Sequence, residues 1–191
     1  MLNILTLFLS YLIGSISFAL VVGKLLYKTD VRNYGSGNLG ATNVFRVLGK
    51  KVGLIVAIAD ILKGTVVCLL PQILNSSVHP IFCGLLAILG HIFPVFAGFK
   101  GGKAVVTATG VLLFLTPFGT LTGFIVFILT LILSKYVSLS SMLAGIVIFI
   151  YSVMFEDKVI IALSLFISVL VIILHRQNIK RIINGTENKL W

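Results

Sequence analysis

The stretch Ile4–Tyr27, which reads ILTLFLSYLIGSISFALVVGKLLY, decides the fold class of this chain. It holds one charged residue, Lys24, among 24 residues. A helix of that length is about 36 Å long and crosses the roughly 30 Å hydrocarbon core of a bilayer. No basic segment precedes the apolar run, so we interpret it as a membrane span and not as a signal peptide.

The composition of the whole chain agrees with this interpretation. Hydrophobic residues make up 59% of its 191 residues and charged residues only 10%. A soluble core cannot cover that much apolar surface, so we expect an all-α, polytopic integral membrane protein whose residues 1–191 form a single domain. The expected spans are residues 4–27, 52–74, 80–98, 104–117, 118–134, 139–155 and 158–175.

The distribution of lysine and arginine favours seven spans over six. Residues 105–134 could form one helix of about 45 Å, but that would scatter the basic residues over both faces. A turn at Thr116-Pro117-Phe118-Gly119 leaves only Lys158, beside Glu156 and Asp157, on the second face. The positive-inside rule then places the N-terminus outside and the C-terminus in the cytoplasm. The cytoplasmic side receives Lys24, Lys28, Arg32, Arg46, Lys50, Lys51, Lys100, Lys103, Lys135, Arg176, Lys180, Arg181 and Lys189.

The formal charge of +10 is explained by this topology and by anionic headgroups, so no nucleic-acid partner is expected. The two cysteines, Cys68 and Cys83, lie in apolar spans outside any metal-binding spacing and read as small buried side chains. Three dispersed histidines and few carboxylates do not resemble a zinc or magnesium site. We expect no metal and no cofactor.

Three glycine-rich polar stretches fall on the predicted cytoplasmic face. The first, GSGNLGATNVFR (35–46), contains a G-x-G-x-x-G, but no β-strand precedes it, so a dinucleotide site is excluded. The others are FKGGK (99–103) and HRQNIKRIINGTENK (175–189). Glycine amides and Ser, Thr and Asn side chains suit a phosphate, as do Arg46, Lys100 and Lys103. One such loop could be an ordinary turn; three with cations favour a phosphate-handling site.

Several other polar residues have a structural and a functional interpretation. We expect Asp60 and Lys63 to form an internal ion pair, with a ligand role as the alternative. His91 is expected to bond a carbonyl freed by the nearby proline. Ser138 reads as a helix cap or a substrate contact, and Lys50, Lys51, Lys180 and Arg181 read as interfacial anchors. His175 and Asn178, three residues apart on one helical face, are expected to reach substrate.

These motifs resemble those of the bacterial membrane acyltransferases that transfer a fatty acyl group from acyl phosphate to glycerol 3-phosphate, the PlsY family. The matching stretches are GSGNLGATN (35–43) with Arg46, DILKG (60–64), GHIFPVFAGFKGGKAVVT (90–107) and GTENK (185–189). Together they cover the chain nearly end to end. Two positions depart from the family pattern: Leu39 stands where proline is frequent, and Ala104 where glycine is usual. The second matters if the backbone φ there is positive.

The resemblance implies a bacterial cell-membrane enzyme with its active site on the cytoplasmic face. It would transfer the acyl group to the C1 hydroxyl of glycerol 3-phosphate, giving lysophosphatidic acid and phosphate, the first acylation step of phospholipid synthesis. It would act as a monomer, and a groove open to membrane lipid would take the acyl chain. The implied catalytic residues are Ser36, Arg46, Lys103, His175 and Asn178. The implied substrate-binding residues are Gly35, Gly37, Asn38, Gly40, Thr42, Asn43, Lys100, Gly101, Gly102, Ser138 and Glu187, the last also ordering the tail.

Two other functions stay open at the level of sequence. The chain has no His-x4-Asp motif of the common soluble-domain acyltransferases, which leaves a membrane transporter for an organic phosphate as an alternative. Transporters place binding groups near the bilayer midplane and often carry inverted repeats, whereas here the polar groups gather at one boundary and no repeat is evident. A non-catalytic lipid-binding subunit is a third alternative, for which three cation-bearing loops would be excessive.

Overall fold

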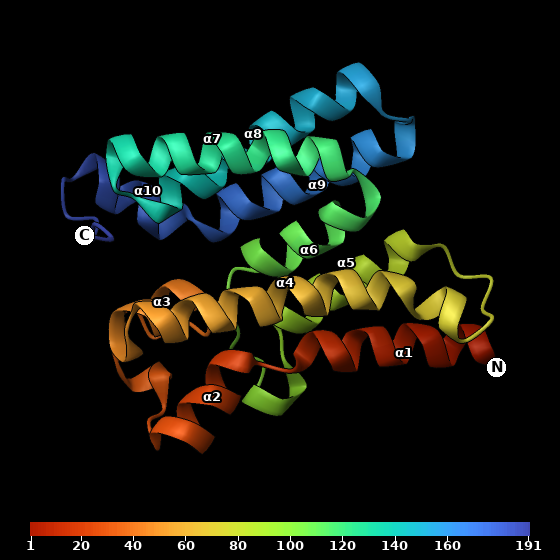
Figure 1. The fold of residues 1–191 in the computed structure, drawn as a ribbon, viewed down its shortest axis with the longest axis horizontal. Helices are drawn as coiled ribbons and strands as arrows, with labels where there is room; N and C mark the ends of the chain where they lie inside the picture. Colours follow the sequence, from red (N-terminus) through yellow and green to blue (C-terminus); the bar gives the residue numbers. More distant parts are fainter. The chain divides into compact units, whose positions relative to one another are not determined.

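The computed structural model describes residues 1–191 and is helical throughout, with no β-strand, which confirms the all-α prediction (Figure 1). The chain divides into two compact units, Met1–Phe114 and Leu115–Trp191, each described by itself below. The elements of unit 1 are α1 (Leu2–Ser15), α2 (Phe18–Tyr27), the 3₁₀ turn η1 (Val31–Asn33), α3 (Ala41–Leu48), α4 (Lys50–Ile73), α5 (Pro80–Ile92), the 3₁₀ turn η2 (Val95–Ala97) and α6 (Val105–Leu115), whose last residue begins unit 2. The remaining elements are α7 (Pro117–Ser134), α8 (Val137–Phe155), α9 (Lys158–Leu174) and α10 (Arg176–Ile183).

Four segments are long and apolar enough to cross a membrane: α4, α5 with η2, α7 and α8. The count rises to six if the bent pairs α1–α2 and α9–α10 each form one span. Helix α6 has 11 residues and is only about 16 Å long, roughly half the thickness of the hydrocarbon core. The predicted count of seven membrane spans therefore stays a prediction. The predicted turn is present, since α6 ends at Leu115 and α7 begins at Pro117.

The first span differs from the expected continuous helix. It breaks at Ile16 and Ser17, which have extended backbones, and the axes of α1 and α2 differ by 47°. No proline causes the break. The Ser17 hydroxyl instead caps α2 by accepting from the Leu20 amide, and the Lys63 ammonium of α4 donates to the Ile16 carbonyl at 2.8 Å. Each side of the break thus gains one side-chain hydrogen bond to a backbone group that the interrupted helix leaves without a regular partner.

Unit 1 is built on close helix contacts. Helix α1 packs along α5, and α4 packs against both. Glycines allow α6 to approach α4 closely. A Cβ at Gly64 would lie 2.2 Å from the Thr107 carbonyl oxygen, and one at Gly110 would lie 2.0 Å from the Ile61 carbonyl oxygen. Small residues allow such crossings in membranes, where close packing replaces the hydrophobic effect between helices. Short α3 lies beside the beginning of α4 (Figure 1).

Unit 2 consists of α7, α8 and α9 as sequential neighbours, with α10 turned away at its end. The chain bends by 57° between α9 and α10 at His175, so Asn178 does not continue the α9 helix as expected. At the opposite end the Thr116 hydroxyl donates to Glu156 at 2.7 Å. This bond ties the start of α7 to the end of α8.

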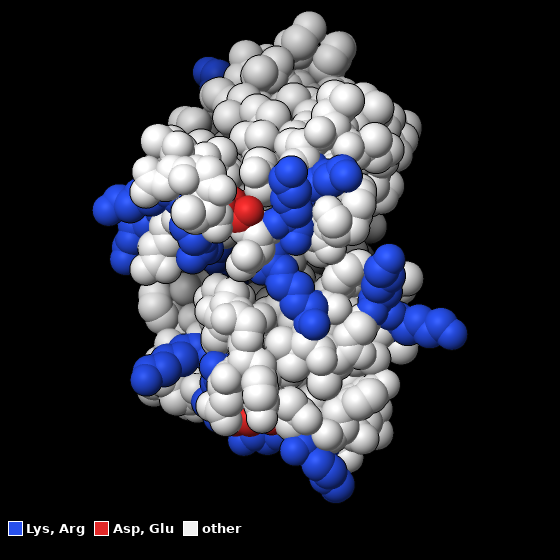
Figure 2. Space-filling model, turned by 90° about the vertical axis from the view of Figure 1, so that its left-hand side faces the viewer, with Lys and Arg blue, Asp and Glu red and all other residues white.

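Within each unit most basic side chains lie at the polar-loop end, whereas Lys158 begins α9 at the other end and Lys63 is buried within α4. Figure 2 shows one face of the space-filling structure, on which lysine and arginine are prominent and little acidic surface is visible. In unit 1 the polar-loop end carries α3 and the beginning of α4, and in unit 2 it carries α10 and the C-terminal tail (Figure 1). The predicted gathering of cations around the polar loops is therefore present within each unit.

Candidate functional site

Asn43 organises the first polar loop, the segment 31–43. Its side chain is buried: Nδ2 donates to the carbonyls of Val31 (2.9 Å) and Tyr34 (3.2 Å), and Oδ1 accepts from the Ser36 amide (2.8 Å). We expected Asn43 among the substrate-binding residues. The structure instead places it beneath the loop as an internal scaffold, with its donors and acceptor used to fix the loop's path.

Ser36 presents its hydroxyl on the exposed side of this loop. The Asn38 carboxamide donates to Ser36 Oγ at 3.4 Å, which leaves the hydroxyl proton to be donated elsewhere. The Gly37 amide donates to the Tyr34 carbonyl at 3.1 Å, so it closes a turn and does not face an anion as expected. Leu39 is 1% exposed and anchors the loop in the apolar core of the unit, a role for which the missing proline is not needed.

Arg46 lies on α3, which begins directly after Gly40. Thr42 and Arg46 are four residues apart on one face of this helix, and both are half-buried. The first amides of a helix carry a partial positive charge that favours an anion. Gly35 is exposed, and a Cβ there would point inward and fall 2.3 Å from Asn43 Oδ1. Of the first motif, the groups best placed for a ligand are the Ser36 hydroxyl and the α3 side chains.

The second polar loop, residues 98–104, is clipped to the end of α5. The Gly101 amide donates to the Ile92 carbonyl (3.1 Å) and the Gly102 amide to the His91 carbonyl (3.2 Å). We expected both glycine amides to cradle a phosphate, but they are used inside the protein. A Cβ at Gly101 would lie 2.0 Å from the His91 carbonyl oxygen, so these glycines serve close approach.

The side chains of this loop are its chemical groups. Lys100 is exposed and Lys103 is half-buried. Ala104, which follows them, has φ +54° and is buried. The position where the family usually has glycine therefore does adopt a left-handed backbone, at a cost of about 1–2 kcal/mol for an L-residue.

Asp60 and Lys63 form the expected ion pair. Lys63 Nζ lies 2.9 Å from Asp60 Oδ1, and both side chains are 1% exposed. His91 does not bond a carbonyl through its ring as predicted. Its Nδ1 lies 3.2 Å from Lys63 Nζ and 3.1 Å from the Thr107 hydroxyl, because α4, α5 and α6 meet at this point.

The tail forms a second network, in unit 2, around Glu187. Oε1 accepts from the Ser138 hydroxyl (2.8 Å) and the Asn178 amide (2.6 Å), and Oε2 accepts from Arg181 Nε (2.7 Å). The side chain is 4% exposed. Burial alone would raise the pKa of Glu187, but the hydrogen bonds from Arg181, Asn178 and Ser138 outweigh it and lower the pKa. Three donors already occupy the carboxylate, so Glu187 holds the tail, and its expected substrate contact is not favoured.

The same network corrects two assignments and shows how the tail turns back. Ser138 is not a helix cap, since its hydroxyl donates to Glu187. Arg181, which the sequence suggested only as an interfacial anchor, is an ion-pair partner. Gly185 has φ +68°, which lets the chain reverse after α10 and carry Glu187 back. The Leu190 amide then donates to the carbonyl between α7 and α8, at Lys135.

His175 is buried at the bend between α9 and α10. Its Nδ1 lies 2.8 Å from the Val171 carbonyl oxygen. A carbonyl only accepts, so Nδ1 carries a proton, and in the neutral ring Nε2 carries the lone pair. This arrangement makes Nε2 a hydrogen-bond acceptor or proton acceptor.

An ion-pair group that the sequence did not single out braces the first loop. Arg32 makes a two-pronged contact with Asp30, with Nε to Oδ1 at 2.9 Å and Nη2 to Oδ2 at 2.6 Å. Lys24 adds a third contact at 3.3 Å. The hydrogen bond from Arg32 is the main reason that the pKa of Asp30 is strongly lowered. Arg32 Nη1 also reaches the Ala97 carbonyl (3.5 Å), which links the first loop to η2.

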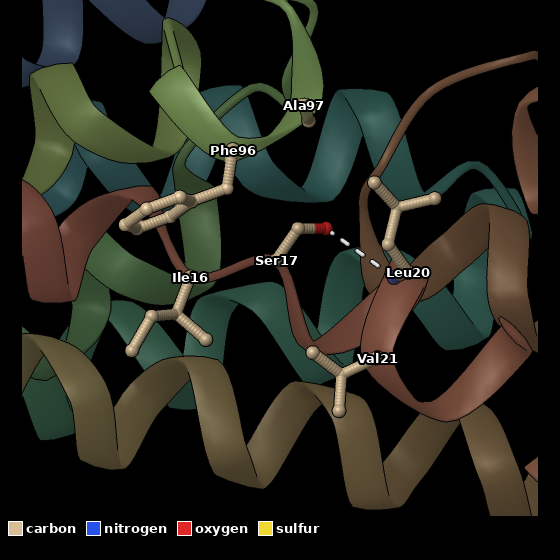
Figure 3. Close-up of a pocket in the computed structure, with 6 residues that line it drawn as sticks. All are labelled: Ile16, Ser17, Leu20, Val21, Phe96 and Ala97. Atoms are coloured by element: carbon tan, nitrogen blue, oxygen red, sulfur yellow. Dashed lines mark hydrogen bonds between the residues drawn. The ribbon is translucent and has the colours of Figure 1, made fainter. Parts of the chain in front are cut away.

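An apolar pocket of about 240 Å³ lies in unit 1 between the α1–α2 break and η2 (Figure 3). The Ser17 hydroxyl turns toward the start of α2, where it accepts from the Leu20 amide, so the surface offered by the pocket is almost wholly apolar. Its lining residues are Ile16, Ser17, Leu20, Val21, Phe96 and Ala97. No group of three or more His, Cys, Asp or Glu side chains able to hold a metal ion occurs in residues 1–191.

Comparisons with known proteins match nearly the whole chain. A family model described as "Glycerol-3-phosphate acyltransferase" matches residues 4–185. "Glycerol-3-phosphate acyltransferase 2" of Bacillus anthracis is 77% identical over 98% of this chain and 99% of its own length. "Glycerol-3-phosphate acyltransferase" of Bacillus subtilis (strain 168) is 52% identical over 100% of this chain and 98% of its own.

Two crystal structures are also similar. They show "PlsY (YgiH), an integral membrane glycerol 3-phosphate acyltransferase", in a glycerol 3-phosphate form and in a form described as "lysphosphatidic acid". The first has a TM-score of 0.90 and 40% identity, and the second 0.87 and 39%. Each alignment covers 98% of this chain and 94% of the other.

Proposed function

The chain belongs to the glycerol-3-phosphate acyltransferase family, and we propose that it takes the acyl group from acyl phosphate and passes it directly to the C1 hydroxyl of glycerol 3-phosphate. Its family and its relatives support a multi-pass membrane enzyme that acylates glycerol 3-phosphate in phospholipid synthesis. They do not support the organic-phosphate transporter or the non-catalytic subunit.

Direct transfer balances without a covalent enzyme intermediate. The C1 oxygen forms a bond to the acyl carbonyl carbon while the bond from that carbon to the phosphate oxygen breaks. The hydroxyl proton passes to the leaving phosphate, so the products are lysophosphatidic acid and hydrogen phosphate. The main obstacle is to bring two phosphate dianions together and orient the hydroxyl. Positioning and cationic stabilisation can supply this.

The observation that carries the proposal is that, in the polar loops of unit 1, glycine amides make internal hydrogen bonds while side chains carry the groups that can bind a ligand. The amides of Gly37, Gly101 and Gly102 are bonded internally. The loops therefore offer a ligand chiefly a hydroxyl and cations, the groups that recognise phosphate. Within its own unit, Ser36 has no histidine or carboxylate in hydrogen-bond contact to make it a nucleophile.

We assign roles to the side chains on this basis. Arg46 holds phosphate oxygens through its planar fork, with Lys103 and Lys100 as point charges. The Ser36 hydroxyl donates one neutral hydrogen bond. His175, whose Nε2 carries the lone pair, accepts from the C1 hydroxyl and orients it, with Asn178 as a further polar contact. The α3 residues and the backbone around Gly35, Asn38, Gly40 and Thr42 complete the substrate-binding set.

The pocket beside η2 is suited to part of the acyl chain. Its volume of about 240 Å³ is below the 300–1,000 Å³ usual for a whole small-molecule ligand. Its lining is apolar, and Ala97 is linked through Arg32 to the first polar loop. Filling it with Val21→Trp should slow turnover of long-chain acyl phosphate more than of short-chain acyl phosphate. Leu25→Trp, on the same exposed face of α2 but outside the pocket, should discriminate between the donors no more than the unaltered enzyme does.

The location and assembly follow the charge distribution. We propose a bacterial cell-membrane protein whose polar loops face the cytoplasm, with lipid as its surroundings, and which works as a monomer without metal or cofactor. Single cysteines at positions 36, 103 and 187, with Cys68 and Cys83 replaced, should resist an impermeant reagent added to intact cells. Cysteines at 75 and 156 should react. Labelling at 103 from outside would refute this topology.

The decisive assay offers purified protein acyl phosphate, acyl-CoA and acyl carrier protein as competing donors. We expect turnover with acyl phosphate alone. Efficient turnover with acyl-CoA in its absence would contradict the proposal. Mass spectrometry of protein quenched with acyl phosphate should show no acyl adduct on Ser36, and a stoichiometric adduct there would make this serine a nucleophile.

A further inference from the structure

The Lys63 ammonium joins three parts of unit 1 that are distant in sequence. Its Nζ contacts Asp60 on its own helix (2.9 Å), the Ile16 carbonyl at the α1–α2 break (2.8 Å) and His91 Nδ1 on α5 (3.2 Å). An ammonium has three N–H groups and no acceptor, so these three contacts use its whole capacity. It also lies 5.9 Å from the centroid of the Phe18 ring, at the start of α2.

These contacts fix the chemical state of His91. Because Lys63 can only donate, Nδ1 of the ring must accept, and the proton of the neutral imidazole is then on Nε2. Nε2 lies against the second polar loop: a Cβ at Gly102 would be 2.4 Å from it. The backbone of His91 holds the same loop through the Gly102 amide. The ring therefore contacts Lys63 and the Thr107 hydroxyl at its Nδ1 edge and lies against the loop at its Nε2 edge.

Asp60 lowers the free-energy cost of burying the Lys63 ammonium at membrane depth. The carboxylate and the ammonium are both 1% exposed, and neither carboxylate oxygen has a hydrogen-bond partner of regular geometry, so the ion pair with Lys63 is the contact that compensates the burial of Asp60. An unpaired charge here would be strongly unfavourable. Asp60 thus offsets part of this cost, and Lys63 acts as donor to both Ile16 and His91.

We propose that Lys63 is a positioning residue for catalysis, which acts through His91 to place the Gly101–Lys103 loop. This role rests on the proposed phosphate contact of Lys103. It differs from simple helix packing, because it requires one ring tautomer and one loop position in addition to a stable bundle. A displacement of about 1 Å at a substrate-positioning group is enough to reduce turnover about 100-fold.

The test separates positioning from stability with a neutral double variant, Asp60→Leu with Lys63→Met. Replacing a buried ion pair by apolar residues of similar size is often neutral for stability, so its unfolding midpoint in detergent should stay within about 5 °C of the unaltered protein. We expect kcat/KM for glycerol 3-phosphate to fall about 10- to 100-fold. Adding His91→Leu should cause little further loss, because the ring has already lost its Lys63 donor and keeps only the contact with the Thr107 hydroxyl. Full activity in the stable double variant would overturn the proposal.

Two controls complete the design. Thr65→Val removes a different α4–α6 hydrogen bond, to the Gly110 carbonyl (2.9 Å), and should leave kcat/KM within about twofold of the unaltered value. Lys103→Met tests the proposed function itself: retained activity would refute the phosphate role of Lys103. If Lys103→Met is inactive and the double variant is fully active, only the positioning role fails.

A measurement on the unaltered protein keeps the proposal testable if the double variant does not fold. The ¹⁵N spectrum of the His91 ring should show an unprotonated Nδ1 and a protonated Nε2. The opposite tautomer, or a doubly protonated ring, would overturn the proposal, since Lys63 could then not be its donor.

Discussion

Glu187→Gln should loosen the C-terminal tail and lower activity although the side chain keeps its shape. Hydrogen bonds to a charged group contribute roughly 1.5–3 kcal/mol and neutral ones about 0.5–1.5 kcal/mol. The bonds from Ser138 and Asn178 would each weaken by about 1 kcal/mol. The NH2 group of the glutamine would face the Arg181 Nε–H, so that two donors would oppose each other. Arg181 is 40% exposed, so its share belongs at the low end. The expected loss is about 2–4 kcal/mol of tail stability.

The only tryptophan of the chain, Trp191, is four residues after Glu187 and reports on the tail directly. In Glu187→Gln we expect its fluorescence to become more accessible to a soluble quencher, and kcat to fall about tenfold or more as Asn178 loses its fixed orientation. Lys189→Gln changes the tail charge at an exposed position without touching the network and should change neither signal. Unchanged quenching together with unchanged kcat in Glu187→Gln would refute the role of this network.

Three further outcomes can be measured in detergent. Gly185→Ala should cost about 1–2 kcal/mol from backbone strain alone, because φ is +68° and a Cβ meets nothing within 4 Å, whereas Gly145→Ala in α8 should be harmless to thermal unfolding. A variant with Asp60 and Lys63 exchanged should be less stable than the unaltered protein. Carboxylate oxygens would then face the Ile16 carbonyl and His91 Nδ1, the two acceptors to which the ammonium now donates. The lowered pKa of Glu187 means that its stabilisation is present above the usual carboxyl range, near pH 4.3, and is lost as the pH falls below it, which a pH series of Trp191 quenching would detect.

Hydropathy and charge were sufficient for the helical class and for the turn between α6 and α7, since Pro117 marks a helix start locally. The break in the first span was not predictable in the same way. No proline lies at Ile16 or Ser17, and the group that holds the break, Lys63, is 47 residues away. Short α3 was missed because a loop rich in glycine, serine and asparagine hides the helix that follows it.

The sequence identified the polar stretches of the site better than the use of each group. The polar stretches suggested substrate contacts at Asn43, Gly101 and Glu187. In the structure all three make hydrogen bonds within the protein. Which partner a carboxamide or an amide selects depends on groups brought close by folding, and no local pattern encodes that choice. Arg181 shows the opposite case: no internal partner was expected for it from the sequence, but the turn at Gly185 brings Glu187 back to form an ion pair with it.

The spacing of Asp60 and Lys63 has a consequence for how the chain enters the membrane during synthesis. At the centre of a helix each would add about 2.5–3.5 kcal/mol to the cost of leaving the translocon. Because the two lie three residues apart on one helix, they can neutralise each other as soon as α4 is helical, before α5 has been made. Helix α4 can thus enter the bilayer as a neutral segment, and its donor is already in place when Ile16 and His91 dock against it.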